Sequence, residues 1–314
     1  MTDKKAYIEF CENHESQIPL FFRPWWLTAV CGENWQVVVV IKGDVLQGAW
    51  VYYTSKKFFF KLLLTPKLTP YHGVYLNYPP GQKPATTRSF EKKTINALYN
   101  KLPAFDFLDQ NLHPALDNVQ PFYWSGFSQS IRYTFTLNTA QPARVLWKGL
   151  NSSIRRAVKK ASERYRLVVT EREDIDGFYE LNKQTFERKG MVPGYGLKFL
   201  KKVDEEAAAH KARKILFAVD EQNRKHAACY LVYDEQTVYY LMGGVNTALK
   251  NTEAATLVMW RAIEFAAENN FKQFDFEGSM IEPVARFFSS FGAKQVAYHR
   301  ISKVNHPLLN LIKK

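Results

Sequence analysis

KILFAVDEQNRKHAACYLVYDEQTVYYLMGGVN, residues 214–246, contains three β-rich runs that are separated by two short polar turns. Runs of Val, Ile, Tyr and Phe bounded by Asp, Asn and Gln are typical of strands joined by tight turns. The stretch therefore predicts an antiparallel meander. A helix is predicted directly after it, in residues 252–270, where Leu257, Ala262 and Ile263 recur at helical spacing.

The first half of the chain repeats this order of elements at an offset of roughly 170 residues. One coincidence would mean little, but four elements in one order indicate a duplicated domain. The four are the meander (35–66 and 214–246), the helix (89–102 and 252–270), the tripeptide Phe-Asp-Phe (105–107 and 274–276) and a closing β segment (122–137 and 286–302).

The repeated unit predicts an α/β chain built on mixed, α+β-type sheets. A helix between two strands of one sheet implies a parallel crossover within a mainly antiparallel sheet. That order of elements is the core of the GNAT fold. We expect two tandem domains of this kind, 1–141 and 142–314, because the polar stretch NTAQPAR (138–144) interrupts the pattern.

The composition is that of a folded protein. The 314 residues are enough for two domains of about 150 residues, and 46% of them are apolar, so packed cores are expected. The three scattered cysteines form no metal-ligand spacing, and no metal is expected. The charged N-terminus and the strand-sized apolar runs predict neither a signal peptide nor a transmembrane segment, and therefore a cytoplasmic protein.

The charge balance is strongly basic. Lys and Arg number 43 against 30 Asp and Glu, which gives a net charge of +13. Such an excess favours anionic partners, among which a phosphorylated carrier, tRNA, an anionic cell-envelope precursor and a membrane surface all stay open.

Five stretches of the second half resemble the FemABX-type acyltransferases of the GNAT group. The element Asp275-Phe276 with Gly278, followed by Phe291-Gly292, is the most specific part. The resemblance implies tandem GNAT domains, of which the first is a degenerate copy. The five stretches are WKGLNSSIRRAVKKA (147–161), YELNKQTFERKG (179–190), YYLMGGVN (239–246), WRAIEFAAENNFKQFDFEGS (260–279) and RFFSSFGA (286–293).

The resemblance also implies an activity. The best-known members of this family transfer an amino acid from aminoacyl-tRNA to peptidoglycan precursors, whereas relatives are predicted to depend on acyl-CoA. Peptidoglycan-bridge enzymes tend to carry a Phe-Lys pair before the Phe-Gly, and this chain has Phe287-Phe288 there. The missing lysine counts against the peptidoglycan reaction, so acyl-CoA is the favoured donor.

The donor site is expected in residues 241–257. In GNAT domains the pantetheine of the donor lies along a splayed strand, and its pyrophosphate meets the start of the next helix. Paired glycines permit close backbone approach or a bulge, and an N-cap at Asn251 or Thr252 would leave N–H groups for phosphate. An ordinary strand–loop–helix joint is the alternative. The predicted donor-binding residues are Gly243, Gly244, Asn246, Lys250 and Thr252.

Transfer of an acyl group to an amine also needs a proton acceptor. Glu277, at the end of the predicted second-half strand, is the first candidate, and side-chain alternation places Asp275 on the same face. Asp275 recurs as Asp106 in the first half, which favours a structural role for it. His299, on the closing β segment, is the third catalytic candidate.

Basic residues of the second half suggest an acceptor side. A basic amphipathic helix is predicted over Leu146–Arg164, and its polar side could hold tRNA or an anionic precursor. Another basic pair follows the next helix, at a position that resembles the acceptor side of the family. A solvated helix face is the alternative. The predicted acceptor-binding residues are Arg155, Arg156, Arg188, Lys189 and Tyr195.

The sequence thus predicts an N-acyltransferase that moves an acyl group from acyl-CoA to an amine bound between two GNAT domains. Two alternatives stay open. One is transfer from aminoacyl-tRNA to a peptidoglycan precursor of the bacterial cell envelope, and the other is a non-catalytic binding protein that keeps the GNAT fold.

Overall fold

The computed structural model describes residues 2–249, 251–278 and 280–312, and the chain forms two compact units. The first unit consists of Met1–Arg132 and Ala297–Lys314, and the second of Tyr133–Val296. The boundaries fall inside two long strands, β6 (Ser128–Asn138) and β12 (Lys294–Val304). Each of these strands therefore contributes residues to both units.

The first unit has a mixed sheet with the strand order β1-β2-β3-β5, in which β4 pairs with β2. Strands β1, β2 and β3 form the predicted meander, and β5 joins β3 in parallel. Helix α3 packs on β1 and β2. The strands are β1 (Trp35–Lys42), β2 (Val45–Lys57), β3 (Phe60–Leu64), β4 (Val74–Leu76) and β5 (Phe107–Asn111); the helices are α1 (Asp3–Asn13), α2 (Pro24–Cys31), α3 (Pro84–Lys101), α4 (Gln120–Trp124) and α11 (Pro307–Ile312), with short 3₁₀ turns at Glu15–Gln17, Leu20–Phe22 and Gly32–Asn34.

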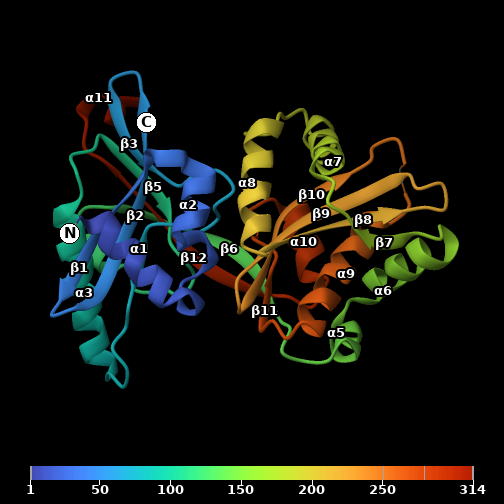
Figure 1. The fold of residues 1–314 in the computed structure, drawn as a ribbon, viewed down its shortest axis with the longest axis horizontal. Helices are drawn as coiled ribbons and strands as arrows, with labels where there is room; N and C mark the ends of the chain where they lie inside the picture. Colours follow the sequence, from blue (N-terminus) through green and yellow to red (C-terminus); the bar gives the residue numbers. More distant parts are fainter. Residues whose placement is uncertain (1, 250, 279, 313–314) are drawn as a thin grey trace. The chain divides into compact units, whose positions relative to one another are not determined.

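The second unit has the strand order β6-β11-β10-β9-β8-β7. Helices α7 and α8 lie on one side of strands β8 to β10, and α5, α6, α9 and α10 lie on the other (Figure 1). The strands are β7 (Val168–Glu171), β8 (Arg213–Val219), β9 (Lys225–Tyr233), β10 (Thr237–Val245) and β11 (Gln273–Asp275); the helices are α5 (Ala143–Gly149), α6 (Ser152–Lys159), α7 (Ile175–Glu187), α8 (Leu197–Ala209), α9 (Ala254–Glu268) and α10 (Glu282–Ser289).

Helix α9 forms the centre of the second core. It is apolar on nearly every side, including Leu257, Trp260 and Ile263, and these side chains are buried. A helix that is hydrophobic all round must be covered all round. Here β8 to β10 cover one side of α9, and α5 and α6 cover others. The mixed α/β class predicted from the sequence is confirmed, and both predicted meanders are present.

The closing strands of the two repeats exchange places. Strand β6 ends the first repeat but pairs antiparallel with β11, which belongs to the second. Strand β12 ends the second repeat but pairs antiparallel with β5 of the first. The division at 141/142 describes the sequence repeats and stays a prediction, whereas the compact units follow the exchanged strands.

Buried contacts hold each exchanged strand in its new sheet. Ile301 of β12 is fully buried in the core of the first unit, and Arg300 forms an ion pair with Asp109 of β5. Phe135 and Leu137 of β6 belong to the core of the second unit. Because these contacts combine apolar burial with charge pairing, the exchange is part of the native packing of each unit.

The predicted basic helix over 146–164 is wrong as a single element. Helix α5 ends at Gly149, because Leu150 adopts an extended conformation. Asn151 then caps α6, its side chain accepting a hydrogen bond from the backbone N–H of Ser153 at 3.1 Å. Asn competes for backbone N–H groups in this way, which favours helix starts over helix interiors. Residues Lys160–Arg164 then form one π-helical turn.

Gly244 gives a direct test of how closely α7 approaches β10. A Cβ atom on Gly244 would lie 2.6 Å from the backbone nitrogen of Asn182 and 2.7 Å from the carbonyl carbon of Leu181. Because the obstacle is helix backbone, Gly244→Ala should lower the free energy of unfolding by about 1–3 kcal/mol, measured by urea denaturation. Gly194→Ala is the matched control, since nothing lies within 4 Å of its added Cβ. Equal stability of the two variants would contradict the close packing.

Candidate functional site

Strands β10 and β11 separate in the middle of the second sheet. They pair in parallel at only three positions, and the last pair is Tyr239 with Asp275. Strand β10 continues to Val245 with β9 as its partner. A register shift against β9 between Tyr240 and Met242 passes over Leu241, which is a β-bulge. Bulges bend a strand and release it from regular pairing. The β11 side of β10 therefore opens beyond Tyr239.

The buried carboxylate of Asp275 organises the end of β11. Asp275 is only 2% exposed. Its Oδ1 accepts hydrogen bonds from the Thr134 hydroxyl at 2.5 Å and from the Glu277 backbone N–H at 2.8 Å. A buried carboxylate that is hydrogen-bonded in this way acts as an anchor. Asp275 thus ties β6 to the turn that carries Glu277.

Glu277 is held in a high-energy state. Its φ is +58°, in the left-handed region, and Gly278 follows at +64°. Its Oε1 is buried and has no hydrogen-bond partner among the described residues. Burial and the nearby Asp275 carboxylate raise the pKa of Glu277 well above its usual range. Left-handed backbone at a non-glycine residue and an unsatisfied buried carboxylate oxygen concentrate at functional sites.

Gly278 allows this turn to lie against β6. An added Cβ would be 2.1 Å from the Tyr133 carbonyl oxygen and 2.5 Å from the Thr134 Cα. Both atoms are backbone and cannot move aside. The left-handed φ and the close approach both require glycine at this position. The turn that carries Glu277 therefore lies directly against the backbone of β6.

A polar cluster from α7 and the α7–α8 loop faces the same region. The Tyr195 hydroxyl lies 3.0 Å from Asn182 Oδ1 and 2.9 Å from Met242 Sδ. Burial is the main cause that raises the pKa of Tyr195, and the charge of Glu277 adds to it. Tyr195, predicted on the acceptor side, is thus within electrostatic reach of Glu277. Its hydroxyl stays neutral and can donate one hydrogen bond.

The two glycines of the predicted donor strand have different neighbours. The Gly243 carbonyl accepts a hydrogen bond from Asn182 Nδ2 at 2.8 Å, so this edge group is already paired. An added Cβ on Gly243 would lie 1.8 Å from the Tyr240 hydroxyl oxygen. Gly244 packs against the backbone of α7. The glycines therefore make room for Tyr240 and for α7. The next residue, Val245, donates its backbone N–H to Thr185 Oγ1 at 2.9 Å.

The loop after β10 is stabilised by its own side chains. Asn246 donates to the Lys225 carbonyl at 3.1 Å and accepts from the Ala248 N–H at 3.0 Å. Thr252 Oγ1 lies 3.3 Å from His226 Nδ1. The expected N-cap at Asn251 or Thr252 is wrong: Glu253 occupies the N-cap in a left-handed conformation with φ +59°, because the chain turns sharply into the buried helix α9. Lys250 lies outside the described residues.

A groove in which three arginines outnumber two carboxylates, Asp220 and Glu221, lies beside this loop, and we call it the cationic groove. Its volume is about 500 Å³, and Ala248, Leu249 and Thr252 of the loop line one part of it. Arg164 and Arg166 enter from the turn after α6, where the π-helical turn is followed by a left-handed Arg166. π-Helical turns occur frequently at functional sites. The third arginine, Arg224, pairs with Asp220 at 2.7 Å, so it also stabilises the β8–β9 turn.

The remaining predicted residues are spread over several places. Arg155 donates to the carbonyls of Lys148 and Leu150 and therefore caps the end of α5. The remaining member of the predicted catalytic set, His299, belongs to the first unit, where burial lowers its pKa despite the opposing charge of Asp117. Arg156, Arg188 and Lys189 are exposed on the second unit.

The sequence analysis missed three residues that shape the candidate site. Thr134 donates a hydrogen bond to Asp275, and Asn182 donates one to the Gly243 carbonyl. The Tyr240 hydroxyl occupies the space that a Cβ on Gly243 would need. Thr134 lies on a strand that the repeat assigned to the other half, so no local pattern could have connected it to Asp275. Asn182 could have been predicted, because it lies on the apolar face of α7 and a buried Asn on a helix needs a hydrogen-bond partner elsewhere.

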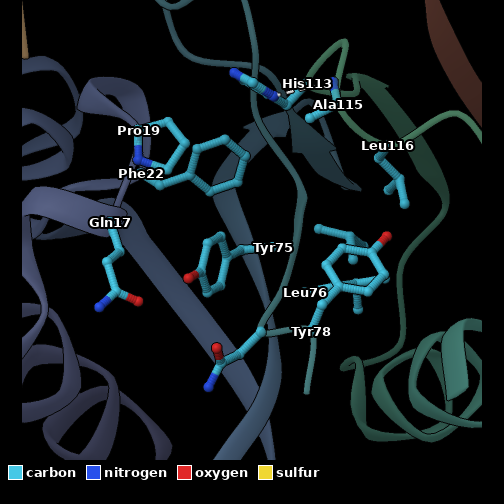
Figure 2. A pocket seen from close by; sticks show the side chains of 11 residues that line it. Gln17, Pro19, Phe22, Tyr75, Leu76, Tyr78, His113, Ala115 and Leu116 are labelled. Carbon is cyan, nitrogen blue, oxygen red and sulfur yellow. Dashed lines mark hydrogen bonds between the residues drawn. The ribbon is translucent and has the colours of Figure 1, made fainter. Parts of the chain in front are cut away.

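A separate pocket of about 360 Å³ lies within the first unit. Figure 2 shows its aromatic walls, formed by Phe22, Tyr75 and Tyr78, with His113 at one end. Burial lowers the pKa of His113 to about 4, and its Nδ1 accepts the Ala115 N–H at 3.2 Å. No Lys or Arg is among the described residues that line it. The pocket is therefore uncharged at neutral pH and differs from the cationic groove.

Comparisons with known proteins identify the fold of the second unit. Residues 149–282 match the family model of the acetyltransferase (GNAT) domain. No curated protein sequence matches the chain. The match covers the bulged strand β10, the helix α9 and the Glu277 turn. Separately, none of the described helices has the length and apolar content needed to cross a membrane.

Solved structures extend the likeness to the whole chain. The crystal structure of FemX has a TM-score of 0.73 at 13% identity and covers 100% of this chain and 99% of its own. L-PGS from Bacillus licheniformis has a TM-score of 0.56 at 12% identity, covering 99% and 95%. A tandem GNAT protein from the clavulanic acid biosynthesis pathway has 0.54 at 10% identity, covering 97% and 95%. The chain has a FemABX-like tandem GNAT fold.

Glu277 should make the stability of the protein depend on pH. Because its pKa is higher in the folded state than in the unfolded chain, where it is about 4.3, its stabilising contribution is complete below that value and is lost as the pH rises through the folded pKa. Glu277→Gln should therefore gain stability relative to wild type between about pH 5 and pH 8, by at most about 1.4 kcal/mol per pH unit.

This prediction is measured by urea denaturation across that pH range. The exposed Glu282 supplies the control, since Glu282→Gln should run parallel to wild type. A stability difference between Glu277→Gln and wild type that does not change with pH would show that Glu277 is not held protonated by the fold.

Proposed function

We propose that this chain, whose second half carries a GNAT acetyltransferase domain, transfers an acyl or aminoacyl group from an activated carrier to an amine. The turn at the end of β11 carries this proposal. There Glu277, with its left-handed backbone and its buried Oε1, lies where β10 and β11 separate. Backbone strain and an unsatisfied carboxylate at the opening of a sheet are typical of functional sites, and they support a catalytic role for Glu277.

The chemistry requires Glu277 in its ionised form. The amine nitrogen attacks the acyl carbonyl carbon, a C–N bond forms, and the bond from carbon to the carrier sulfur or oxygen breaks. The proton released by the amine passes to the Glu277 carboxylate, directly or through one water. A raised pKa makes this carboxylate a stronger base than an exposed glutamate. Asp275 keeps the base in place through its bond to the Glu277 N–H.

Acyl-CoA is the carrier that we favour. The bulge at Leu241 interrupts regular strand pairing next to the opening, where a carbonyl oxygen could meet N–H donors. The Gly243 carbonyl and the Val245 N–H are already bonded to α7, so the carrier would use the strand nearer the bulge. The groove with Arg164 and Arg166, about 500 Å³ in volume, could receive the phosphates of a nucleotide carrier. Those phosphates would replace Glu221, which lies 3.3 Å from Arg166, as the partner of that arginine.

Aminoacyl-tRNA is the alternative carrier. The net charge of +13 and the exposed Arg156 and Lys159 on α6 favour it, and FemX and L-PGS share the fold. The two carriers differ in how binding responds to salt. Affinity for tRNA should fall steeply, with a log–log slope of about −0.7 to −0.9 for each phosphate contact. Acetyl-CoA should bind saturably with a weak salt response.

The pH dependence of the rate tests the role of Glu277. Thiol release from acetyl-CoA is measured with a panel of primary amines, and kcat/KM should rise with pH through the raised pKa of Glu277. Glu277→Gln should lower kcat/KM by about 10²–10⁴-fold and remove that limb. Asp275→Asn keeps an acceptor for Thr134 and for the Glu277 N–H but removes the charge, so the limb should move to lower pH.

An unchanged pH profile in both variants would remove Glu277 as the base. Loss of rate in Asp275→Asn without displacement of the limb would assign Asp275 to structure alone. Absence of thiol release with every amine, together with no binding of acetyl-CoA, would favour aminoacyl-tRNA or a binding protein.

The arginines of the groove test the carrier site separately. Arg164→Ala combined with Arg166→Ala should weaken acetyl-CoA binding by about 10-fold or more, because two charge-assisted contacts to phosphate are lost. Calorimetric titration measures the affinity, and dephospho-CoA shows which phosphate is involved. Arg144→Ala, an exposed arginine on α5 outside the groove, is the control. Equal affinity of wild type and the double variant would place the carrier elsewhere.

A further inference from the structure

The turn between β2 and β3 exposes two phenylalanines. Strand β2 ends at Lys57 and β3 begins at Phe60, so Phe58 and Phe59 form the connection. Phe58 is 86% exposed and Phe59 is 68% exposed. Two-residue hairpin turns favour Asn and Gly, and Phe58 has a left-handed φ of +56°. An aromatic residue at this position is unfavourable for the turn and gains nothing from burial.

Lysines surround this tip. Lys56 and Lys61 lie directly opposite each other across the hairpin, and Lys57 lies opposite Phe60. Like charges at facing positions of a hairpin destabilise it. No carboxylate forms an ion pair with Lys56, Lys57 or Lys61 within the described part of the chain. The tip therefore combines two unfavourable features, exposed rings and uncompensated positive charge, that the folding of the unit does not require.

The start of α11 enlarges the apolar surface. The ring of His306 lies 5.0 Å from that of Phe60 and 6.0 Å from that of Phe59, between ring centroids. Leu308, in the first turn of α11, is 51% exposed. Figure 1 shows α11 beside the β2–β3 turn within the first unit. We call this surface the aromatic tip; it consists of Lys56, Lys57, Phe58, Phe59, Lys61, His306 and Leu308.

The chemistry of the aromatic tip fits an anionic lipid surface better than a protein. A stable protein interface buries about 800 Å² on each partner, and the tip is a narrow hairpin end. Aromatic rings on a projecting turn can enter the headgroup layer, while flanking lysines remain at the phosphates. Each lysine near an anionic membrane adds attraction of its own, and the net charge of +13 adds to it.

We propose that the aromatic tip attaches this protein peripherally to anionic membranes. Phe58 and Phe59 enter the headgroup layer, with Leu308 at its edge, and Lys56, Lys57 and Lys61 bind lipid phosphates. This attachment does not depend on the acyl-transfer site, whose residues belong to the second unit.

Vesicle co-sedimentation tests the proposal. Full-length protein is mixed with vesicles of phosphatidylcholine alone or with phosphatidylglycerol added, at low and at high salt. Wild type should sediment with phosphatidylglycerol vesicles and be released by salt. Phe58→Ser combined with Phe59→Ser should lower the partition coefficient by about 10-fold or more. Replacing the three lysines by Gln should lower it by about 100-fold.

Trp124→Ser is the matched control, because Trp124 is an exposed aromatic residue of the same unit outside the aromatic tip. It should bind vesicles like wild type, and thermal melting should show that every variant is folded. Wild type that stays in solution with phosphatidylglycerol vesicles would overturn the proposal. So would equal binding of wild type and the double Phe variant, or a wild-type dimer in gel filtration that the double variant disrupts without any vesicle binding.

Discussion

The hydrogen bonds of the buried Asp275 carboxylate connect the fold to the candidate chemistry. One of them comes from the Thr134 hydroxyl of β6, and another comes from the backbone N–H of Glu277. The same carboxylate therefore fastens the exchanged strand and sets the turn that carries the proposed base. Burial raises the pKa of Glu277, and the negative charge of Asp275 raises it further. Stability and reactivity are coupled here, because any change in Asp275 alters the strand, the turn and the proton affinity together.

The opening of the second sheet follows from where pairing stops. Strand β10 has nine residues, but only its first three pair with β11. Beyond Tyr239 its backbone is held by α7 through Asn182 and Thr185, and the bulge at Leu241 bends it away. Helix α7 can replace a strand only because Gly244 allows its backbone to approach within van der Waals distance. The separated strands thus depend on a helix packed where a side chain would not fit.

Periodicity and repetition predicted the elements but not their partners. Both meanders and the helices α3 and α9 were readable from local patterns, because apolar spacing reports which face of an element is buried. The exchange of β6 and β12 could not be predicted, since each strand would show the same apolar pattern in either sheet. Glu277 was singled out from its place after a strand. Its left-handed backbone and its unsatisfied oxygen are features of the folded structure that no local pattern contains.

Strand register shows why only the second copy has a glutamate at the position of the proposed base. The sequence aligned Asp275 with Asp106, but Asp106 precedes β5. Counted from the first parallel pair, Leu62 with Phe107 and Thr237 with Gln273, the counterpart of Asp275 is Asp109.

In the first copy these positions are occupied differently. The charge of Asp109 is matched by Arg300. Two residues later Asn111 stands where the second copy has Glu277, and its side chain is bound to the Pro70 carbonyl at 3.2 Å. Strand β3 is paired with β5 up to its last residue, Leu64, so no edge opens there. The first copy therefore has paired groups where the second has an unsatisfied carboxylate and an open edge, and paired groups are the arrangement that folding alone favours.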